Sequence, residues 1–254
     1  MPTAVITGAS SGIGAAIAAR LAKEGYDLVL VARRADRLIE QAVKLRTQAV
    51  KVQTVAVDLM DAGAFEKIQA VVPAPNVLIN NAGMGLFGRA EGHSVADQLK
   101  VVRLNCESLT ELTLGFLPAM VERGSGVVVN LGSVAGLQPV PYFAVYAATK
   151  AYVHSLSEAL DEEFGQRGVR FVIVAPGPVP TEFQGIAGSP DANLDHDHRS
   201  PEQIAEETWR AIKRPRRLVV PVAKHRFMHF MQRFVPRSAV LAIAAKKMQG
   251  RGLD

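Results

Sequence analysis

The sequence is poor in cysteine and aromatic residues, and it contains no long uninterrupted apolar run. Its 254 residues include a single cysteine, Cys106, so no disulfide can form within the chain, and the lone thiol suits a reducing compartment. No apolar run reaches the length that a membrane-spanning helix needs. A strand-like segment begins at Thr3, which leaves no room for a signal peptide before it. We therefore expect a cytoplasmic protein.

Acidic residues are almost absent from the C-terminal part of the chain. From Arg210 onward there are twelve basic residues and one acidic residue, Asp254, whereas the net charge of the whole chain is only +5. The pattern predicts a basic amphipathic extension over residues 223–254 that packs on the body of the protein or on a second subunit. Peripheral contact with an anionic membrane is the alternative, and we expect no nucleic-acid partner because no recognised module is present. The large apolar residues at helical spacing are Phe227, Phe230, Met231 and Phe234.

Short apolar runs alternate with helical patterns along the rest of the chain. Hydrophobic residues make up 48% of the sequence, which is enough for a substantial core. The alternation predicts an α/β fold, a Rossmann-like doubly wound parallel sheet of about seven strands with helices on both faces. We expect a single domain over residues 1–254. The predicted strands are Thr3–Ile6, Asp27–Ala32, Val52–Val57, Val77–Ile79, Gly126–Leu131, Arg170–Val174 and Leu218–Val222.

A glycine-rich loop follows the first predicted strand and leads into a helical pattern over Ala15–Glu24. Gly8 permits a tight turn, Gly12 lets the backbone approach a phosphate closely, and Gly14 lets the helix pack on the strand. The free N–H groups and the positive end of the helix would then face an anion. The loop therefore predicts a pyrophosphate site, although glycine-rich turns between a strand and a helix also occur for structural reasons alone.

Three polar side chains are spaced so that they can meet at one point. Tyr146 and Lys150 stand one turn apart in a helical pattern, so the phenol and the ammonium share a face. Ser133 follows the end of a predicted strand and would aim a hydroxyl at the same volume. Such a group can move a proton onto or off an oxygen atom.

Polar or turn residues also follow three other predicted strands, at the edge of a parallel sheet where ligands bind. Together with the glycine loop and the pattern S-x(12)-Y-x-x-x-K, these segments resemble the short-chain dehydrogenase/reductase family, from about Thr3 to Thr181. The Thr-Gly-x-x-x-Gly-x-Gly loop and the Tyr-x-x-x-Lys pair are similar to those of NADP-preferring members. The three segments are Asp58-Leu59, Asn80-Asn81-Ala82-Gly83 and Pro176-Gly177-Pro178-Val179-Pro180-Thr181.

The resemblance implies a role for each residue of the catalytic group. Tyr146 would be the general acid when a carbonyl is reduced and the base when an alcohol is oxidised. Lys150 would bind the nicotinamide ribose and, with the positive charge of the oxidised cofactor, lower the pKa of the phenol. Ser133 would hold the substrate oxygen beside the phenol. Asn105 would order a water near the lysine, although helix asparagines are commonly only solvated or bonded to their own backbone.

The same resemblance implies the cofactor contacts. Ile13 and its flanking amides would meet the pyrophosphate, Asp58 the adenine amino group and Thr181 the carboxamide. Where NAD-dependent relatives carry an acid after the second strand, this chain has Arg33 and Arg34, which predicts NADP(H) rather than NAD(H); the alternative is that both arginines are ordinary solvated residues. The predicted cofactor-binding residues are Gly8, Ser10, Ser11, Gly12, Ile13, Gly14, Arg33, Arg34, Asp58, Leu59, Asn81, Ala82, Gly83, Tyr146, Lys150, Pro176, Gly177, Val179 and Thr181.

The residues expected around the substrate are mostly apolar, which favours a hydrophobic ketone, aldehyde or secondary alcohol, although several could simply fill the core. Residues 182–210 are predicted to form a lid, with a helix starting at Ser200. The run Asp195-His196-Asp197-His198 lies within it, and we expect no metal there because such close neighbours rarely converge on one ion. The apolar candidates are Met84, Leu86, Phe87, Val134, Leu137, Pro139, Val140, Phe143, Val179 and Phe183.

The leading functional hypothesis is an NADP(H)-dependent carbonyl reductase, or the reverse dehydrogenase. A nucleotide-sensing or scaffold protein without turnover is the main alternative, and an isomerase or dehydratase on the same scaffold is a third. Resemblance alone implies a homodimer or homotetramer that pairs through helices over Asp97–Arg123 and Ala144–Arg167.

Overall fold

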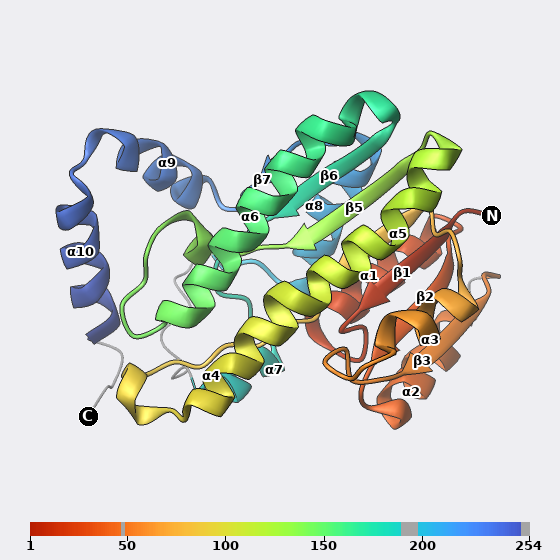
Figure 1. Ribbon diagram of the computed structural model, residues 1–254, viewed down its shortest axis with the longest axis horizontal. Helices are drawn as coiled ribbons and strands as arrows, with labels where there is room; N and C mark the ends of the chain where they lie inside the picture. The colour runs from red at the N-terminus through yellow and green to blue at the C-terminus, as the bar shows by residue number, and fades with distance from the viewer. Residues whose placement is uncertain (47–48, 189–197, 250–254) are drawn as a thin grey trace.

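Seven parallel strands form one sheet in the computed structural model, which describes residues 1–46, 49–188 and 198–249 (Figure 1). The order of the strands is β3-β2-β1-β4-β5-β6-β7, and every neighbouring pair is parallel. This is the predicted Rossmann-like architecture. The strands are β1 (Thr3–Thr7), β2 (Asp27–Ala32), β3 (Val52–Ala56), β4 (Val77–Asn80), β5 (Gly126–Leu131), β6 (Val169–Val174) and β7 (Leu218–Val219).

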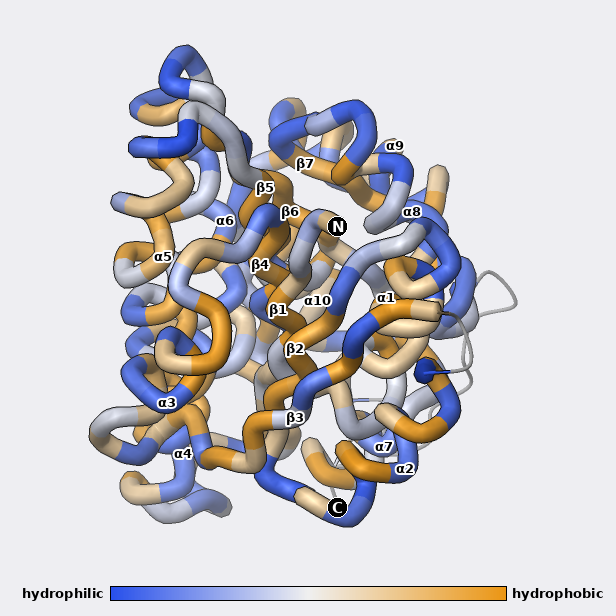
Figure 2. Tube along the Cα trace, turned by 90° about the vertical axis from the view of Figure 1, so that its right-hand side faces the viewer, coloured by the Kyte–Doolittle hydropathy of each residue, from blue (hydrophilic) through white to orange (hydrophobic). Residues whose placement is uncertain are grey.

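Helices cover both faces of the sheet (Figure 2). Buried side chains of α1, α2 and α8 pack on one face, and those of α3, α5 and α6 pack on the other. Two further helices, α9 and α10, follow β7 and lie beyond the layers (Figure 1). The α-helices are α1 (Gly12–Lys23), α2 (Ala35–Arg46), α3 (Ala64–Val71), α4 (Val95–Val102), α5 (Leu109–Arg123), α6 (Ala144–Phe164), α7 (Glu182–Ile186), α8 (Pro201–Lys213), α9 (Ala223–Met231) and α10 (Arg237–Gln249).

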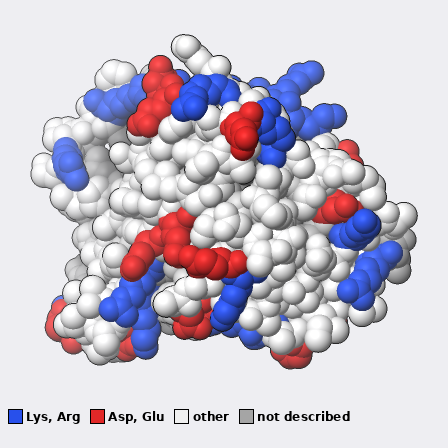
Figure 3. Space-filling view, turned by 45° about the vertical axis from the view of Figure 1, so that its right-hand side comes forward, with Lys and Arg blue, Asp and Glu red and all other residues white. Residues whose placement is uncertain are grey.

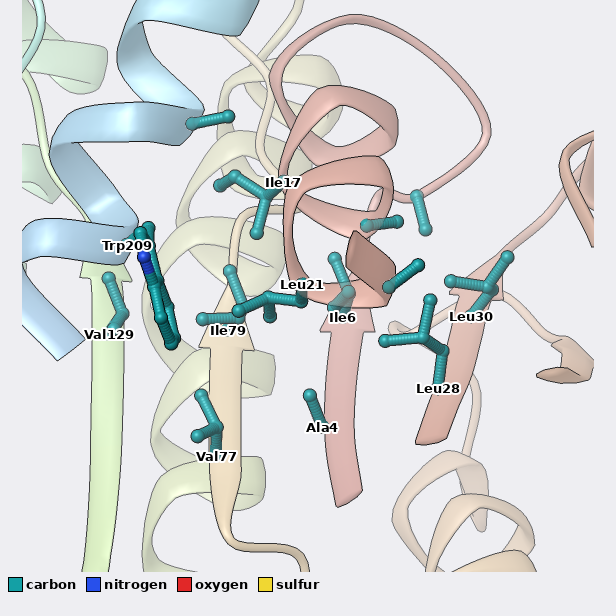
Figure 4. Close-up of a cluster of buried hydrophobic side chains, with 14 of the residues drawn as sticks. Ala4, Ile6, Ile17, Leu21, Leu28, Leu30, Val77, Ile79, Val129 and Trp209 are labelled. Atoms are coloured by element: carbon teal, nitrogen blue, oxygen red, sulfur yellow. The ribbon is translucent and has the colours of Figure 1, made fainter. Parts of the chain in front are cut away.

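Successive side chains of a strand point to opposite faces of the sheet, so neighbouring apolar residues join different hydrophobic cores, one on each face. Ile6 on β1 points toward α1, next to Leu21, and Trp209 of α8 lies over Val129 and Ile79 in the same core (Figure 4). The neighbour of Ile6, Val5, points the opposite way and joins the core under α5 and α6. Both sides of the central strands are therefore apolar, as expected for a parallel sheet that is covered on both faces.

The order of the strands reverses between β1 and β4, which are adjacent in the sheet although β2 and β3 lie between them in the sequence. The loops after these two strands diverge to opposite faces, and a crevice opens at their carboxyl ends. The glycine loop after β1, the Asn-Asn-Ala-Gly segment after β4 and Ser133 after β5 all lie at this edge. The topology thus brings together segments more than a hundred residues apart.

A buried carboxylate fixes the helix that carries Tyr146 and Lys150. Asp161, near the C-terminal end of α6, accepts hydrogen bonds from Arg170 Nε at 2.8 Å, from the backbone N–H of Phe171 at 3.0 Å and from Arg217 Nε at 3.0 Å. Burial alone would raise the pKa of Asp161, but these donors outweigh it and hold the pKa below its usual value. The helix α6 is therefore anchored to β6 and to the segment before β7.

Part of the predicted lid is instead a core helix. Ser200 caps α8 in a capping box with Gln203, as predicted, but Ile204 and Trp209 of this helix are buried against the sheet. The apolar period of α8 faces α1, so residues 201–210 belong to the core and the predicted boundary at residue 210 is wrong. The last strand is also shorter than predicted and ends at Val219.

The described part of the C-terminal extension, residues 223–249, is mostly helical, as predicted, but its apolar stripe does not pack on the body. Phe227, Phe230 and Phe234 are 65%, 52% and 69% exposed. Helical spacing indicated only that these residues share a face, and no other part of the described chain covers that face. None of the described helices is both long enough and apolar enough to cross a membrane.

Candidate active site

A cavity of about 520 Å³ lies at the carboxyl edge of the sheet. It is lined by the glycine loop, the ends of β2, β4, β5 and β6, and side chains of α6, α7 and α9. All the predicted cofactor-binding residues line it except Gly14, which lies behind the loop. Ser133, Tyr146 and Lys150 line it as well, whereas Asn105 does not. The predicted residues are thus brought together, although their roles remain predictions.

The glycine loop forms a cradle that larger residues would fill. Gly8 and Gly12 have φ values of +65° and +56°, which favour glycine, and a Cβ on Gly14 would lie 2.3 Å from the carbonyl oxygen of Gly8. No side chain caps the first turn of α1, and that turn contains no acidic residue. Its backbone N–H groups and the positive helix end are therefore available to an anion. The residues present fit a dinucleotide pyrophosphate.

Thr7 and Asn81 hold the glycine loop against the end of β4. The Thr7 hydroxyl accepts hydrogen bonds from the backbone N–H groups of Asn81 and Ala82, both at 3.0 Å. Asn81 Nδ2 donates to the carbonyl oxygens of Thr7 at 2.9 Å and Gly8 at 3.2 Å. The side chain of Asn81 is therefore engaged in the loop itself, a structural role that the sequence did not reveal.

The two predicted phosphate-binding arginines have different surroundings. The guanidinium of Arg34 donates to Glu182 Oε2 at 2.8 Å and to Ser11 Oγ at 3.1 Å, which joins α7 to the glycine loop. The hydrogen bond from Arg34 lowers the pKa of Glu182. The side chain of Arg33 is 70% exposed, and its closest acid is Asp58, at 3.6 Å. Arg33 is therefore the more accessible of the two to a ligand.

Ser133 is positioned by a close approach between β5 and α6. A Cβ on Gly132 would lie 2.3 Å from His154 Nε2, so only glycine fits between the strand end and the helix. The backbone N–H of Ser133 points at this nitrogen at 3.5 Å. Burial lowers the pKa of His154 to about 4, aided by the charges of Lys150 and His229, so the ring is neutral at pH 7. The sequence analysis missed His154, which lies one turn beyond Lys150.

Tyr146 is a buried phenol held between aromatic rings. Phe143 stacks on it with ring centroids 4.3 Å apart, and Phe183 lies 5.6 Å away. Burial raises the pKa of Tyr146 to about 12, although a hydrogen bond with Ser133 opposes the shift. The Lys150 ammonium lies 5.7 Å from the centroid of the phenol ring, and the expectation that it lowers this pKa together with the oxidised cofactor stays a prediction. With this pKa the phenol keeps its proton at neutral pH.

Lys150 is buried beside the phenol and is held by a backbone oxygen. Its Nζ donates to the carbonyl oxygen of Leu131, at the end of β5, at 2.7 Å. Burial lowers the pKa of Lys150 to about 8. At neutral pH the side chain is still mostly protonated, so it can donate hydrogen bonds into the cavity.

Asn105 reaches the site from a π-helical segment, Arg103–Ser108, between α4 and α5. Its Oδ1 accepts from the backbone N–H of Met84 at 3.0 Å, and its Nδ2 donates to the carbonyl oxygen of Met84 and to Thr149 Oγ1. A Cβ on Gly83 would lie 3.2 Å from Asn105 Oδ1 and 3.6 Å from Lys150 Nζ. Asn105 thus ties the segment after β4 to α6 on the side where the lysine lies.

The other end of the cavity is mostly apolar, and α9 contributes to it unexpectedly. Met228, His229 and Gln232 line this end, and Gln232 donates a hydrogen bond to Gln138. Among the predicted apolar candidates, Met84 and Pro139 do not line the cavity, and Leu86 faces a separate hollow. The candidates that do line it are Phe87, Val134, Leu137, Val140, Phe143, Val179 and Phe183.

The sequence predicts no metal in the run Asp195-His196-Asp197-His198. Asp195, His196 and Asp197 lie outside the described residues. Over the part of the chain that the structure describes, no group of three or more His, Cys, Asp or Glu side chains could hold an ion. Burial raises the pKa of the Cys106 thiol, as expected for a cysteine that packs as a small apolar residue.

Comparison with known proteins points to one family. The family model for short chain dehydrogenase matches residues 2–190. The chain is 40% identical over 210 residues to sulfoacetaldehyde reductase 2 of Chromohalobacter salexigens, which covers 80% of this chain and 83% of that protein. It is 34% identical over 221 residues to the very-long-chain 3-oxoacyl-CoA reductase of Bos taurus, and this match covers 82% of this chain and 68% of that protein.

Solved structures agree with this assignment. A short-chain dehydrogenase from Sphingobium yanoikuyae in complex with NADPH superposes with a TM-score of 0.82 at 34% identity, covering 87% of this chain and 88% of that chain. Other similar structures hold NADP+ or NAD.

The buried neutral His154 predicts a loss of stability in acid. The folded protein resists protonating this ring until the pH approaches about 4, whereas the unfolded chain accepts a proton near pH 6.5. The free energy of unfolding should therefore fall by up to about 3 kcal/mol as the pH drops from 6.5 to 4. His154→Gln keeps an acceptor for the N–H of Ser133 but cannot titrate. The free energy of unfolding of this variant, measured with urea, should therefore fall less steeply as the pH drops.

The control is His93→Gln, which removes a half-buried histidine whose Nε2 lies 3.0 Å from the carbonyl oxygen of Phe87. This variant should keep the acid dependence of the unaltered protein. If the free energy of unfolding fell equally with pH in His154→Gln and in the unaltered protein, His154 would not be the source of the acid sensitivity.

Proposed function

This chain belongs to the short-chain dehydrogenase family of oxidoreductases, and we propose that it transfers a hydride between NADP(H) and the carbonyl or secondary alcohol of an apolar substrate. One observation carries the proposal: a buried phenol lies beside a hydroxyl and an ammonium in the cavity that the glycine loop also lines. A nucleotide sensor needs the glycine loop but has no use for a proton donor. A sensor or scaffold without turnover is the alternative.

In the direction of reduction, bound NADPH supplies the hydride. Ser133 holds the carbonyl oxygen by a hydrogen bond, so that the oxygen lies next to the phenol. Tyr146 then gives its proton to this oxygen as the alcohol forms. Its pKa of about 12 keeps the proton in place at neutral pH until the oxygen becomes basic. Lys150, held by the carbonyl oxygen of Leu131, would donate to a ribose hydroxyl of the cofactor and would keep a positive charge near the phenolate that remains.

The same groups serve oxidation in reverse. Tyr146 must then accept a proton, for which a pKa of about 12 is unfavourable. Binding of the positively charged oxidised cofactor close to the phenol would lower that pKa. Reduction is therefore the direction that the protein's own residues favour at neutral pH.

The preference for NADP(H) rests on Arg33. Ala32, Arg33 and Arg34 line the cavity after β2, whereas Asp36 does not. Arg33 is exposed and pairs only loosely with Asp58, so it can turn to a phosphate. Arg34 is already engaged with Glu182 and Ser11 and would contribute less.

Apolar residues on the outer faces of α4, α5 and α6 support a homodimer or homotetramer. Leu99, Leu114 and Tyr152 are 47%, 45% and 42% exposed on these helices. A second copy of the chain would remove them from water.

Replacing Tyr146 tests the proposed reaction. Tyr146→Phe keeps the ring but removes the transferable proton, so kcat for reduction of the best substrate in a panel of ketones and aldehydes should fall about 10²–10⁴-fold. NADPH affinity, measured by fluorescence, should stay within about threefold because the glycine loop is unchanged.

Tyr26→Phe is the control, since it removes a hydroxyl from a ring that packs on Trp209, away from the cavity. It should keep full activity. NADPH binding without turnover of any ketone, aldehyde or alcohol would favour the sensor instead.

Replacing Arg33 tests the choice of cofactor. Arg33→Ala should lower kcat/KM with NADPH about ten- to a hundredfold and leave kcat/KM with NADH nearly unchanged, because only the 2′-phosphate loses a charge-assisted partner. Arg37→Ala, which removes the same charge from a residue that does not line the cavity, is the matched control. Equal preference for the two cofactors in the unaltered protein would rule out the assignment.

A further inference from the structure

The segment from α9 through Gln232–Phe234 to α10 has two different faces. Met228, His229 and Gln232 face inward and line the substrate end of the cavity. Phe227, Phe230 and Phe234 do not line it and lie in solvent. The rings of Phe230 and Phe234 pack edge to face, with their centroids 5.4 Å apart. No residue of α9 or of Gln232–Phe234 is buried. A cluster of exposed phenylalanines on a segment that also lines a cavity is typical of a binding surface.

The same segment carries exposed cations without acidic neighbours. No Asp or Glu occurs between Glu207 and Asp254 in the sequence. Arg233, Arg237 and Lys246 are exposed, and none of them forms an ion pair with a described carboxylate. On the face in Figure 3, by contrast, acidic and basic side chains lie next to one another. The cations of the extension are therefore available to an external anion.

The geometry points to an anionic phospholipid surface as the partner, and we propose that this segment docks the protein on such a membrane. The cations would bind the lipid headgroups, and Phe227, Phe230 and Phe234 would enter the boundary between headgroups and acyl chains. Among the described elements, α9 and α10 lie at the end of the sheet opposite β3 (Figure 1).

A second copy of the chain fits this surface less well. A symmetric dimer on this face would set the same cations against each other without acidic partners. A nucleic acid would satisfy the cations, but it would leave the phenylalanines next to a charged backbone. An anionic lipid surface would pair its headgroups with the cations and would also take up the phenylalanines.

Docking would place the α9 wall of the cavity at the membrane. The inward face of α9 forms one wall of the apolar end, and Gln249 of α10 donates to Tyr142 Oη at 2.8 Å, next to Phe143. An apolar substrate dissolved in the lipid could then enter without crossing water. This consequence rests on the proposed function, whereas docking itself does not.

Sedimentation with vesicles tests the docking. The full chain should bind phosphatidylcholine vesicles that contain phosphatidylserine at least tenfold more tightly than vesicles of phosphatidylcholine alone, and added salt should weaken the binding. Replacing Arg233, Arg237 and Lys246 together by Gln should weaken it roughly a hundredfold, at about fivefold per cation.

The matched control replaces three exposed lysines of the N-terminal half by Gln. Lys23, Lys51 and Lys67 carry the same total charge but lie away from the extension. This triple variant should bind the anionic vesicles within about threefold of the unaltered protein. An equal loss in both triple variants would show that net charge alone drives binding, and would overturn the proposal.

The apolar part is tested by Phe227→Ser, Phe230→Ser and Phe234→Ser in one chain, which should bind anionic vesicles at least tenfold more weakly. Because these residues are exposed, the melting temperature and NADPH binding should not change. Unchanged vesicle binding in this variant, with equal affinity for duplex DNA, would identify a general polyanion surface instead. Conversion of a dimer into a monomer would identify a contact between subunits. Either outcome overturns the proposal, and neither depends on turnover.

Discussion

The site depends on the burial of two ionisable side chains against the end of β5. Tyr146 and Lys150 are one turn apart on α6, and both are more than nine-tenths buried. Burial shifts the two pKa values toward the neutral forms, so that the phenol keeps its proton and the ammonium holds its proton less tightly. The ammonium remains mostly charged at pH 7 because its pKa of about 8 still lies above that pH, and it donates to the carbonyl oxygen of Leu131. A loose contact between α6 and β5 would admit water and remove both effects.

Several distant elements maintain that contact. Gly132 allows β5 to approach α6, and Asp161 anchors the far end of the helix to Arg170 and Arg217. Asn105 joins α6 to the segment after β4. The reversal of strand order between β1 and β4 then sets the glycine loop beside this assembly. The proton donor and the dinucleotide cradle thus share one cavity because of the sheet topology.

Local patterns predicted the sheet, the glycine loop and the grouping of Ser133, Tyr146 and Lys150, because period, spacing and turn chemistry are local properties. They did not predict contacts that long-range packing decides. Glu182 meets Arg34 across 148 residues, and the π-helical segment around Asn105 is held by a hydrogen bond from Ser108 Oγ to the carbonyl oxygen of Leu59. Helical spacing likewise grouped the phenylalanines of α9 but gave no information on what covers them.

Burial keeps Tyr146 a protonated donor throughout the neutral range. Ultraviolet absorbance of phenolate, measured across pH on the unaltered protein and on Tyr146→Phe without cofactor, tests it directly, since the difference isolates this one phenol. The difference signal should appear only above about pH 11, in line with a pKa of about 12. A phenolate signal that already develops between about pH 7 and pH 9 would contradict the account, because an exposed phenol titrates near pH 10 and only strong charge stabilisation could bring it lower.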